Sequence, residues 1–507
     1  MTKAMVAVVI VLGLAAAGAQ EAPRRTHLVI VVDGLRPDYV TPDVMPRLTA
    51  LGQRGIVFNA HHSVFPTVTR VNASSFVTGV YPEAHGLMGN TIYVPRANPT
   101  TPLDTGKREN LEDVERAEGR LLTSPTLSEL LRPGGKSLLV VSSGSSGATY
   151  LLNHTLATGG IIHYEFSRPS ELAGEAARVL GAAPAAATPN DGRNQYAVDS
   201  YLKVALDKLH PDVTFMWLND PDGTAHSNGI GSDLTRKSLT LVDSCIGRIE
   251  DTLRAKGLLE RTNIIVTSDH GFSTHTGELK LDALVQPFAR RMPDGSPDIV
   301  VAEGAIHFRA GADAARVAEV VAALQKRPEV GAIFTRPRTK GAAEGTAAGT
   351  LSFDVARWSH SGRSAEILVS PNWTSAKNAA GFEGTTTASG VAGHGSSSPY
   401  DIHNTLIAAG PDFREHAISD VPTANVDIAP TLVRLLGLPP AKTMTGRVME
   451  EALRNGPPIA SIRVAHSLKT VTTADRSYQL TAHLSNVAGS AYLDFTEVKR
   501  TAPMSPR

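Results

Sequence analysis

Residues 28–34 read LVIVVDG, an unbroken apolar run that ends in an aspartate and a glycine. Such a run of Val, Ile and Leu is typical of a short strand that is covered on both faces. Similar runs lie at 137–141, 213–218, 263–267 and 404–409, and helical stretches are expected at 45–53, 73–78, 124–131, 199–209, 232–256 and 424–436. This alternation predicts an α/β sandwich around a mostly parallel sheet.

Two further regions interrupt or follow this pattern. Residues 275–390 are rich in Ala, Gly, Arg and Pro, with one strand-like run at 305–309 and a clear helix at 312–325. We expect them to form a cap, inserted between two pieces of one active site in a domain that spans residues 24–457. After Pro457 and Pro458, alternating segments at 459–465 and 477–484 predict a small β appendage over residues 458–507.

Composition narrows the class of protein. The chain has 507 residues, 42% of them hydrophobic, which is ample for a large buried core. Lys and Arg together number 49, as do Asp and Glu, so the formal net charge is zero. The composition therefore does not indicate a strongly basic face, and a nucleic-acid duplex is not expected as a partner. Cys245 is the only cysteine, which excludes an intramolecular disulfide and favours a small buried thiol.

The N-terminus has the features of a secretory signal peptide. Lys3 precedes an apolar run at 5–17, and the small residues Ala17-Gly18-Ala19 come just before Gln20. We therefore expect residues 1–19 to be a signal peptide and the protein to be periplasmic or secreted. The run is short for a bilayer span, although an uncleaved anchor is the alternative. No later segment is long and apolar enough to cross a membrane.

Polar side chains follow three of the predicted strands. Asp33 follows the first, Asp269 and His270 follow 263–268, and Asp222 and His226 follow 213–218. Open α/β sheets bind ligands beyond the carboxyl ends of their strands, so we expect these residues to approach one another. The spacing of four between Asp222 and His226 lets both hold one ion. A separate Gly-His-Gly at 393–395 gives His394 a flexible setting from which to approach a metal.

Each of these residues alone has an ordinary explanation. Asp, Gly and Asn are common in turns, and a lone histidine in a glycine loop is more often incidental. Together, however, three strand ends and a distant loop supply an Asp/His set suited to two zinc ions, or to other divalent ions. The set therefore favours a metal-dependent hydrolase of phosphate esters.

A nucleophile is expected in the segment FPTVTRVN, residues 65–72. Pro66 ends any preceding element, so Thr69 would begin the next helix, where free N–H groups and the helix dipole favour an anion. The alternative is that Thr69 only caps this helix.

At these positions the chain resembles the nucleotide pyrophosphatase/phosphodiesterase family of the alkaline phosphatase superfamily. The resemblance covers about residues 26–446 apart from the cap. Its motifs are Thr-x-x-Asn at 69–72, Thr-Gly-x-Tyr-Pro-x-x-His-Gly at 78–86, Pro-Asp-x-x-x-His at 221–226, Ser-Asp-His-Gly at 268–271 and Gly-His-Gly at 393–395. The resemblance implies an alkaline-phosphatase-like three-layer sandwich. It also implies zinc-dependent hydrolysis of phosphodiester or pyrophosphate bonds through a phospho-threonine intermediate.

The resemblance further implies a role for each site residue. Thr69 would be the nucleophile, in preference to Thr67. Asn90 would hydrogen-bond a nonbridging phosphoryl oxygen, although an ordinary turn after Gly89 is an equal alternative. One zinc would be held by Asp222, His226 and His394. The other would be held by Asp33, Asp269, His270 and the Thr69 oxygen.

The sequence leaves the choice of substrate open. Relatives that cleave monoesters or phosphonates commonly have a Lys-x-Arg or Lys-x-Lys pair after the strand that follows the nucleophile, whereas residues 142–147 read SSGSSG here. The absence of a cation in this segment favours singly charged, nucleotide-like diesters. Nucleotide-cleaving relatives usually place Phe directly after the nucleophile and an aromatic residue five positions before the Asp-x-x-x-His. This chain has Arg70 and Trp217 at those positions.

Both of these residues have more than one interpretation. Trp217 would stack on a base or belong to the core. Arg70 would stack on a base, bind a second phosphate, stay solvated, or clamp a monoester oxygen, which would indicate an alkaline phosphomonoesterase or phosphonate hydrolase. A non-catalytic binding protein with the same fold is the alternative of another class, but no ligand residue is missing.

Overall fold

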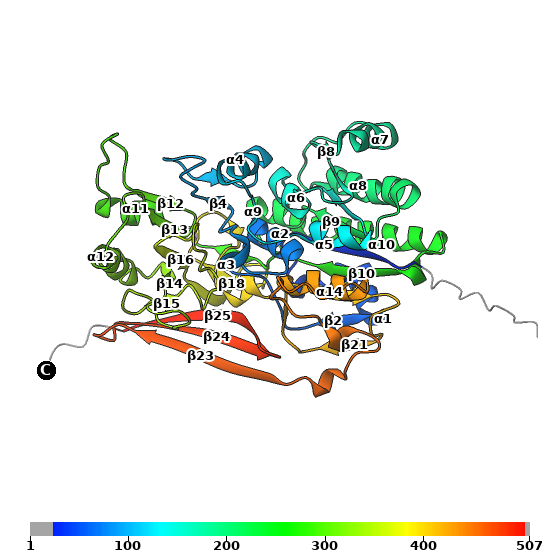
Figure 1. The fold of residues 1–507 in the computed structure, drawn as a ribbon. Coiled ribbons are helices and arrows are strands. Elements are labelled where there is room, and N and C mark those ends of the chain that lie inside the picture. Colours follow the sequence, from blue (N-terminus) through cyan, green and yellow to red (C-terminus); the bar gives the residue numbers. More distant parts are fainter. Residues whose placement is uncertain (1–23, 502–507) are drawn as a thin grey trace, which may run out of the picture.

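A nine-stranded sheet forms the centre of the protein, which is described for residues 24–501 by a computed structural model (Figure 1). The strand order is β21-β2-β20-β10-β1-β9-β6-β7-β8. The strands are β1 (Thr26–Val32), β2 (Ile56–Phe58), β6 (Leu138–Ser142), β7 (Gly160–His163), β8 (Ser167–Arg168), β9 (Val213–Leu218), β10 (Thr262–Thr267), β20 (Leu406–Ala409) and β21 (Ala417–Ser419). Neighbours from β10 to β7 are parallel, whereas β20 runs antiparallel to β10. This confirms the predicted α/β fold; the predicted signal peptide lies outside the described residues.

Helices cover both faces of the sheet, because alternate residues of its strands face two different cores. Val29 and Val31 pack into one core, and Leu28 and Ile30 into the other. The first core is covered by α2 (Thr69–Thr78), α4 (Arg108–Glu118), α5 (Leu127–Leu131), α6 (Ser146–Leu152) and α14 (Ile428–Leu435). The second is covered by α1 (Pro46–Arg54), α7 (Ser170–Leu180), α8 (Asp191–Asp199), the π-helical segment Ser200–Leu209, α9 (Asp222–Asn228) and α10 (Asp233–Ala255). The result is a three-layer sandwich.

The helix ends follow local sequence signals. α5 starts at Leu127, three residues after the predicted start, because Thr126 and Glu129 form a capping box there, with Thr126 N donating to Glu129 Oε2 at 2.7 Å. α2 starts at Thr69 and so includes the predicted nucleophile in its first turn. The predicted helix at 424–436 is divided into a 3₁₀ turn, Asn425–Asp427, and α14. Among residues 24–501 no helix is long and apolar enough to span a membrane.

Residues 275–390 contain a second sheet with a core of its own. Its order is β12-β13-β16-β14-β15, formed by β12 (Ile299–Ala302), β13 (Ala305–Phe308), β14 (Val330–Thr335), β15 (Leu351–Ser352) and β16 (Ile367–Pro371). α11 (Leu281–Val285) and α12 (Ala314–Gln325) pack on it. In Figure 1 this unit lies beside the central sheet, at the left. The predicted strand at 305–309 and helix at 312–325 correspond to β13 and α12, whereas the other four strands were not predicted.

A small four-stranded sheet connects this unit to the central sandwich. Its order is β17-β18-β11-β19, with β11 (Ser273–His275), β17 (Trp373–Lys377), β18 (Glu383–Thr386) and β19 (Ala392–Gly393). β11 leaves the Asp-His end of β10, and β19 leads into His394. The sheet therefore holds the two ends of the long insertion together.

The C-terminal residues form three long antiparallel strands, β23 (Val464–Thr472), β24 (Tyr478–Val487) and β25 (Ser490–Arg500). Figure 1 shows them in orange and red below both sheets. The predicted strand at 459–465 is wrong for most of its length, because Ile459–Ser461 forms a 3₁₀ turn after the two prolines and β23 starts only at Val464. Tyr478 OH donates to Gly331 O at 2.8 Å, and Tyr492 OH donates to Asp427 Oδ2 at 2.9 Å. The three strands are thus bonded to both neighbouring units.

Tyr492→Phe should weaken the attachment of the C-terminal strands. The buried hydroxyl donates to Asp427 and accepts from Arg447 Nε at 3.0 Å, so its loss leaves charged groups short of a partner. We expect a loss of about 1.5–3 kcal/mol in the free energy of unfolding, measured by urea denaturation. Tyr39→Phe is the matched control, because the equally buried Tyr39 OH has no partner among residues 24–501 and its removal should change stability by less than about 0.5 kcal/mol. Equal stability of the two variants would contradict the expectation.

Candidate active site

Three parallel strands end side by side at one edge of the central sheet. β9, β1 and β10 are neighbours, and the residues that follow them include Asp222, Asp33 and Asp269. Asp222 N donates to Asp33 O at 3.1 Å, and Gly34 N donates to Asp269 Oδ1 at 3.2 Å. Parallel pairing therefore brings together carboxylates that lie far apart in the sequence.

The candidate metal-ligating atoms form two overlapping groups. In each group the ligand atoms lie within 4.8 Å of one another: Asp222, His226 and His394 in one, and Asp33, Asp222 and His270 in the other. Asp222 Oδ1 lies 3.1 Å from His226 Nε2 and 3.4 Å from His394 Nε2. His270 Nε2 lies 3.4 Å from Asp33 Oδ1 and 3.1 Å from Asp269 Oδ2. All six predicted Asp and His residues are brought together, and Asp222 belongs to both groups.

Each histidine is oriented by a backbone carbonyl. The Nδ1 atoms of His226, His270 and His394 lie 2.9, 2.9 and 2.8 Å from the carbonyl oxygens of Ala392, Gly271 and Thr67. A carbonyl oxygen only accepts, so Nδ1 carries a proton, and in the neutral ring Nε2 presents its lone pair. In the neutral form of each ring, which is the form that binds a metal ion, Nε2 therefore faces the carboxylates as an acceptor.

Three carboxylate oxygens are buried without a hydrogen-bond partner among the described residues: Asp33 Oδ1, Asp222 Oδ1 and Asp269 Oδ2. They face the Nε2 atoms of the three histidines, which are acceptors when the rings are neutral. Burying such groups costs several kcal/mol unless a cation satisfies them. The donor set of carboxylate oxygens and imidazole nitrogens fits zinc and similar divalent ions.

The electrostatics of the cluster indicate the same need for a cation. Burial and the neighbouring carboxylates of Asp269 and Asp222 raise the pKa of Asp33 well above its usual value. Burial, together with the neighbouring His270, lowers the pKa of His394 to about 4, which keeps this imidazole neutral. Burial lowers the pKa of His226, but the Asp222 carboxylate outweighs this effect and raises that pKa to about 8.

Thr69 lies at the rim of this cluster. It is the first residue of α2 and is 5% exposed, and its Oγ1 lies 3.3 Å from His270 Nε2. Thr67 Oγ1 instead donates to Ser396 O at 2.8 Å and so supports the loop that carries His394. The side chain of His226 keeps 42% of its surface exposed, so the cluster is accessible from this side.

Asn90 and Arg70 lie next to Thr69. Asn90 Oδ1 accepts a hydrogen bond from Arg70 N at 3.0 Å, which fixes the amide at the start of α2. The Arg70 guanidinium forms no ion pair with any residue of the described chain, and its buried Nε has no hydrogen-bond partner there. Arg70, the residue after the predicted nucleophile, therefore carries a charge that has no ion-pair partner in the described chain.

Trp217 occupies a different position from the one expected for a base-stacking residue. Its side chain is fully buried and packs edge-on against Phe76 of α2. Its indole N–H donates to Asp33 Oδ2 at 2.9 Å. The ring therefore supports the carboxylate of Asp33, a candidate metal ligand, and offers no exposed face to a substrate. This agrees with the alternative that Trp217 belongs to the core.

Sequence reasoning missed one residue at this site, Glu303 in the turn between β12 and β13. Asn90 N donates to Glu303 Oε2 at 2.7 Å. The sequence gives no signal for this contact, because a single glutamate before a glycine in residues 275–390 looks like an ordinary turn residue.

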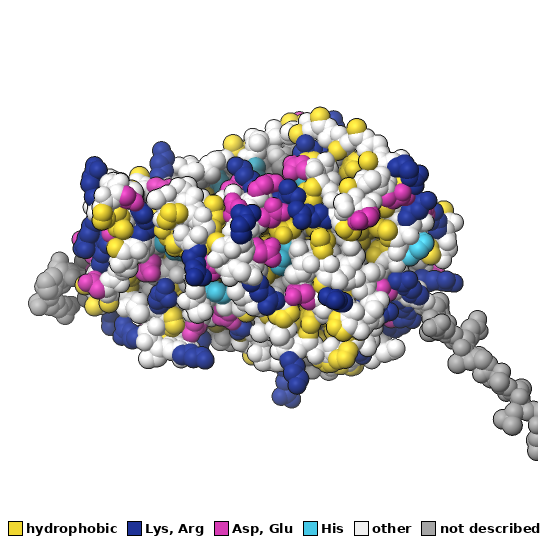
Figure 2. All heavy atoms as spheres, turned by 45° about the horizontal axis from the view of Figure 1, so that its top comes forward, with side chains coloured by type: hydrophobic (Ala, Val, Ile, Leu, Met, Phe, Trp, Pro, Cys, Tyr) yellow, Lys and Arg dark blue, Asp and Glu magenta, His cyan; other side chains and the backbone are white. Residues whose placement is uncertain are grey.

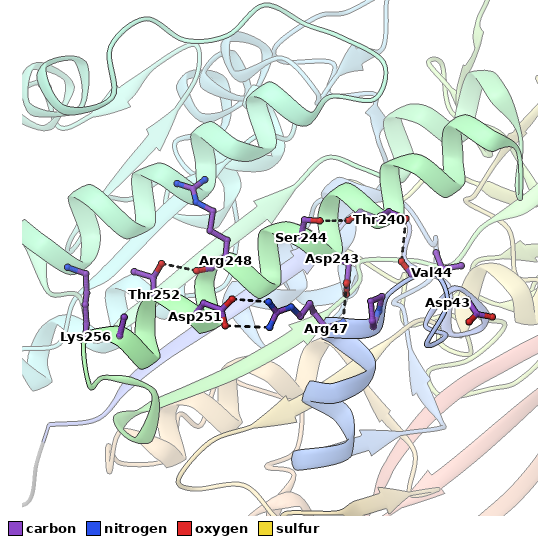
Figure 3. A pocket seen from close by; sticks show the side chains of 12 residues that line it. Asp43, Val44, Arg47, Thr240, Asp243, Ser244, Arg248, Asp251, Thr252 and Lys256 are labelled. Atoms are coloured by element: carbon purple, nitrogen blue, oxygen red, sulfur yellow. Dashed lines mark hydrogen bonds and ion pairs between the residues drawn. The ribbon is translucent and has the colours of Figure 1, made fainter.

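Other surface features have no part in this site. A groove of about 790 Å³ lies between α1 and α10 (Figure 3). Two of its acidic groups have partners within it: Arg47 Nη2 lies 2.9 Å from Asp251 Oδ2, and Asp243 accepts from the α1 backbone. On the face drawn in Figure 2, basic and acidic side chains are interspersed over the described residues and form no continuous basic surface. This agrees with the equal numbers of the two charges.

Comparison with known families agrees with the motifs. A family model described as type I phosphodiesterase / nucleotide pyrophosphatase matches residues 27–396. The chain belongs to this family. Human ectonucleotide pyrophosphatase/phosphodiesterase family member 1 is 26% identical over 293 residues, which cover 54% of this chain and 27% of that protein. Bis(5'-adenosyl)-triphosphatase ENPP4 of Bos taurus is 24% identical over 275 residues, which cover 53% of each. The chain thus spans between about a quarter and a half of these relatives.

A solved structure supports the fold. Murine ectonucleotide pyrophosphatase/phosphodiesterase 5, an inactive variant in complex with AMP, superposes with a TM-score of 0.61 at 18% identity. The match covers 85% of this chain and 100% of that chain. At this identity the likeness extends to the alkaline-phosphatase-like architecture alone.

Zinc binding to protein freed of metal by chelation should release a proton from His226. Its pKa of about 8 means that the imidazole is protonated at neutral pH, and the ion competes with that proton. We expect the apparent affinity to rise as the pH rises towards about 8 and to level off above it. The number of protons released should therefore fall by about one between pH 6.5 and pH 9.5, measured by calorimetry in buffers of different ionisation enthalpy.

His226→Gln should remove this pH-dependent step, whereas His466→Gln, at an exposed site on β23, should preserve it. A proton release that does not change across this pH range would exclude His226 as a ligand.

Proposed function

We propose that this chain is a metal-dependent phosphodiesterase or nucleotide pyrophosphatase that cleaves singly charged, nucleotide-like phosphoric esters outside the cytoplasm. The observation that carries the proposal is the set of three buried carboxylate oxygens without hydrogen-bond partners in the described chain, next to the hydroxyl of Thr69. The named relatives support it, since they include a pyrophosphatase/phosphodiesterase, a dinucleoside triphosphatase and a venom phosphodiesterase from Macrovipera lebetinus.

Two zinc ions, or other divalent ions, would be held by the residues of the cluster. Asp222, His226 and His394 suit one ion, and Asp33, Asp269 and His270 suit the other. When bound, such ions supply positive charge that favours the alkoxide of a nearby hydroxyl and neutralises the oxygen that leaves phosphorus.

The residues of the chain then divide the reaction into two displacements. Thr69 Oγ1 attacks phosphorus, the bond to the leaving oxygen breaks, and a phospho-threonine forms. Water attacks the phosphorus of this intermediate and restores the Thr69 hydroxyl. The dipole at the start of α2 and the Asn90 amide favour the negative charge on the nonbridging oxygens during both steps.

The charges around Thr69 favour a diester over a monoester. The loop 142–147, where monoester-cleaving relatives carry cations, contains only Ser and Gly. A second negative charge on the substrate would have Arg70 as its nearest free partner. Arg70 is also the observation that favours the second candidate function, an alkaline phosphomonoesterase or phosphonate hydrolase, because its unpaired guanidinium could clamp a dianion.

Thr69→Ala should abolish hydrolysis of bis-p-nitrophenyl phosphate, lowering kcat by roughly 10⁴-fold or more, because the attacking oxygen is lost. Zinc content, measured by atomic emission, should change little, since six other ligands remain. Thr69→Ser should keep measurable turnover, and Thr67→Ser should behave as wild type because it preserves the hydrogen bond to Ser396. Wild-type turnover by Thr69→Ala would remove Thr69 from its assigned role.

Arg70→Ala should separate the two candidate functions. The purified wild-type protein should hydrolyse bis-p-nitrophenyl phosphate and a dinucleotide pyrophosphate faster than p-nitrophenyl phosphate, measured as kcat/KM. If Arg70 binds a second phosphate, its removal should lower kcat/KM for the dinucleotide pyrophosphate by about 10-fold or more, and kcat/KM for the simple diester much less. Arg116→Ala, on an exposed face of α4, is the charge control. A wild-type preference for the monoester, lost in Arg70→Ala, would favour the phosphomonoesterase.

A further inference from the structure

The turn between β12 and β13 projects one side chain towards the candidate active site. Ala302 pairs with Ala305, so only Glu303 and Gly304 form the turn. Glu303 has a left-handed φ of 54°. At Gly304 a Cβ atom would lie 2.3 Å from Val369 O, so the neighbouring strand β16 leaves no room for a side chain there. The turn is therefore held in one conformation by its own sheet.

Glu303 reaches across to the backbone of Asn90. Its Oε2 accepts from Asn90 N at 2.7 Å, and the two residues are 213 positions apart in the chain. A hydrogen bond from an N–H to a carboxylate is among the stronger kinds in proteins. The contact is made where Asn90 leads into β4 (Thr91–Ile92), which is only two residues long.

The other polar groups of Asn90 are also occupied, with one exception. Its carbonyl oxygen accepts from Thr105 N at 2.9 Å and from Thr105 Oγ1 at 2.6 Å, and its Oδ1 accepts from Arg70 N at 3.0 Å. Because Oδ1 must face the Arg70 N–H, the direction of the amide is determined. Only the Nδ2 donors have no bond to a residue within 24–501. The arrangement orients a free NH₂ group beside Thr69.

We propose that Glu303 is a positioning residue for phosphoryl transfer, which fixes the Asn90 backbone so that the Asn90 amide meets the phosphoryl group at Thr69. This inference rests on the proposed function, in which Asn90 donates to a nonbridging oxygen. It assigns the inserted residues 275–390 a part in catalysis, since the unit that carries Glu303 has its own sheet and core. Glu303 itself does not touch the reacting atoms.

A double-mutant cycle on the zinc-loaded enzyme tests this role, with kcat and KM measured on bis-p-nitrophenyl phosphate. Asn90→Ala should lower kcat by about 10²–10³-fold, the usual cost of a lost donor to the reacting group. Glu303→Ala should lower kcat by about 10–100-fold through misplacement of that donor. In the Asn90→Ala background, however, Glu303→Ala should cost less than about twofold, because the group that it positions is absent.

Two conservative variants separate reach from charge. Glu303→Gln keeps an oxygen at the same reach and should retain kcat within about threefold of wild type. Glu303→Asp keeps the charge and tolerates the left-handed conformation, but its shorter side chain withdraws from Asn90, so its kcat should fall as in Glu303→Ala. Glu303→Asp also provides the cycle with a folded variant if Glu303→Ala is unstable. Glu319→Ala, at an exposed site on α12 of the same unit, should leave kcat unchanged.

Affinity for orthovanadate, which mimics the transition state, tests the role of Glu303 separately from stability, because a purely structural contact would not change this affinity. Glu303→Asp should weaken inhibition by vanadate by about the same factor as kcat, while the midpoint of thermal unfolding stays near that of wild type. Additive losses in the cycle, or a fall in kcat that follows only a fall in stability, would overturn the role of Glu303. Wild-type kcat in Glu303→Asp with a reduced kcat in Asn90→Ala would overturn it as well. Failure of the wild-type enzyme to cleave any phosphoric ester would instead overturn the proposed function.

Discussion

The proposed chemistry of this protein depends on three neighbouring carboxylates, each with one buried oxygen. Asp33, Asp222 and Asp269 each leave one oxygen without a hydrogen bond among the described residues, and histidine nitrogens approach them as acceptors. Removing one ionised carboxylate from water costs several kcal/mol, and placing three together adds mutual repulsion. The Trp217 indole and the Gly34 N–H each donate to one of these carboxylates, but the three oxygens named above have no such donor in the described chain. A divalent cation at this position would balance the charge of these carboxylates.

The register of the central sheet explains how these carboxylates are held. Val31 of β1 pairs with Trp217 of β9. Asp33 comes two residues after Val31, just beyond the end of β1, so it lies on the same face of the sheet as the indole ring. Strand alternation places that ring in the core under α2 with Phe76, and its N–H still reaches Asp33. The same periodicity that buries the tryptophan thus makes it a donor to the site. A base-stacking role would require the ring to leave this core.

The sequence could predict the strand ends but not the supports around them. A buried parallel strand is recognisable by its apolar run, and the residue after it lies at the ligand-binding edge of the sheet. The positions of Asp33 and Asp269 could therefore be predicted from the sequence. His394 was found through its glycine loop and the family resemblance. The carbonyl partners of the histidines depend on loop conformation, which has no short-range signal. The strands at 299–302 and 367–371 escaped prediction because each is a short run that needs its partners to be stable.

The backbones of the clustered aspartates and of Asn90 are held in place in different ways. Asp33, Asp222 and Asp269 follow strands of a nine-stranded sheet, so their backbones are fixed by long ladders of hydrogen bonds and need no help from elsewhere. Asn90 stands before a strand of two residues, and its backbone has only Thr105 as a local partner. A hydrogen-bond donor on such a short segment has a fixed position only if other parts of the protein hold the segment in place. The bond to Glu303 supplies this support from a sheet whose own core keeps the turn in place, and so links the inserted unit to the position of a single amide.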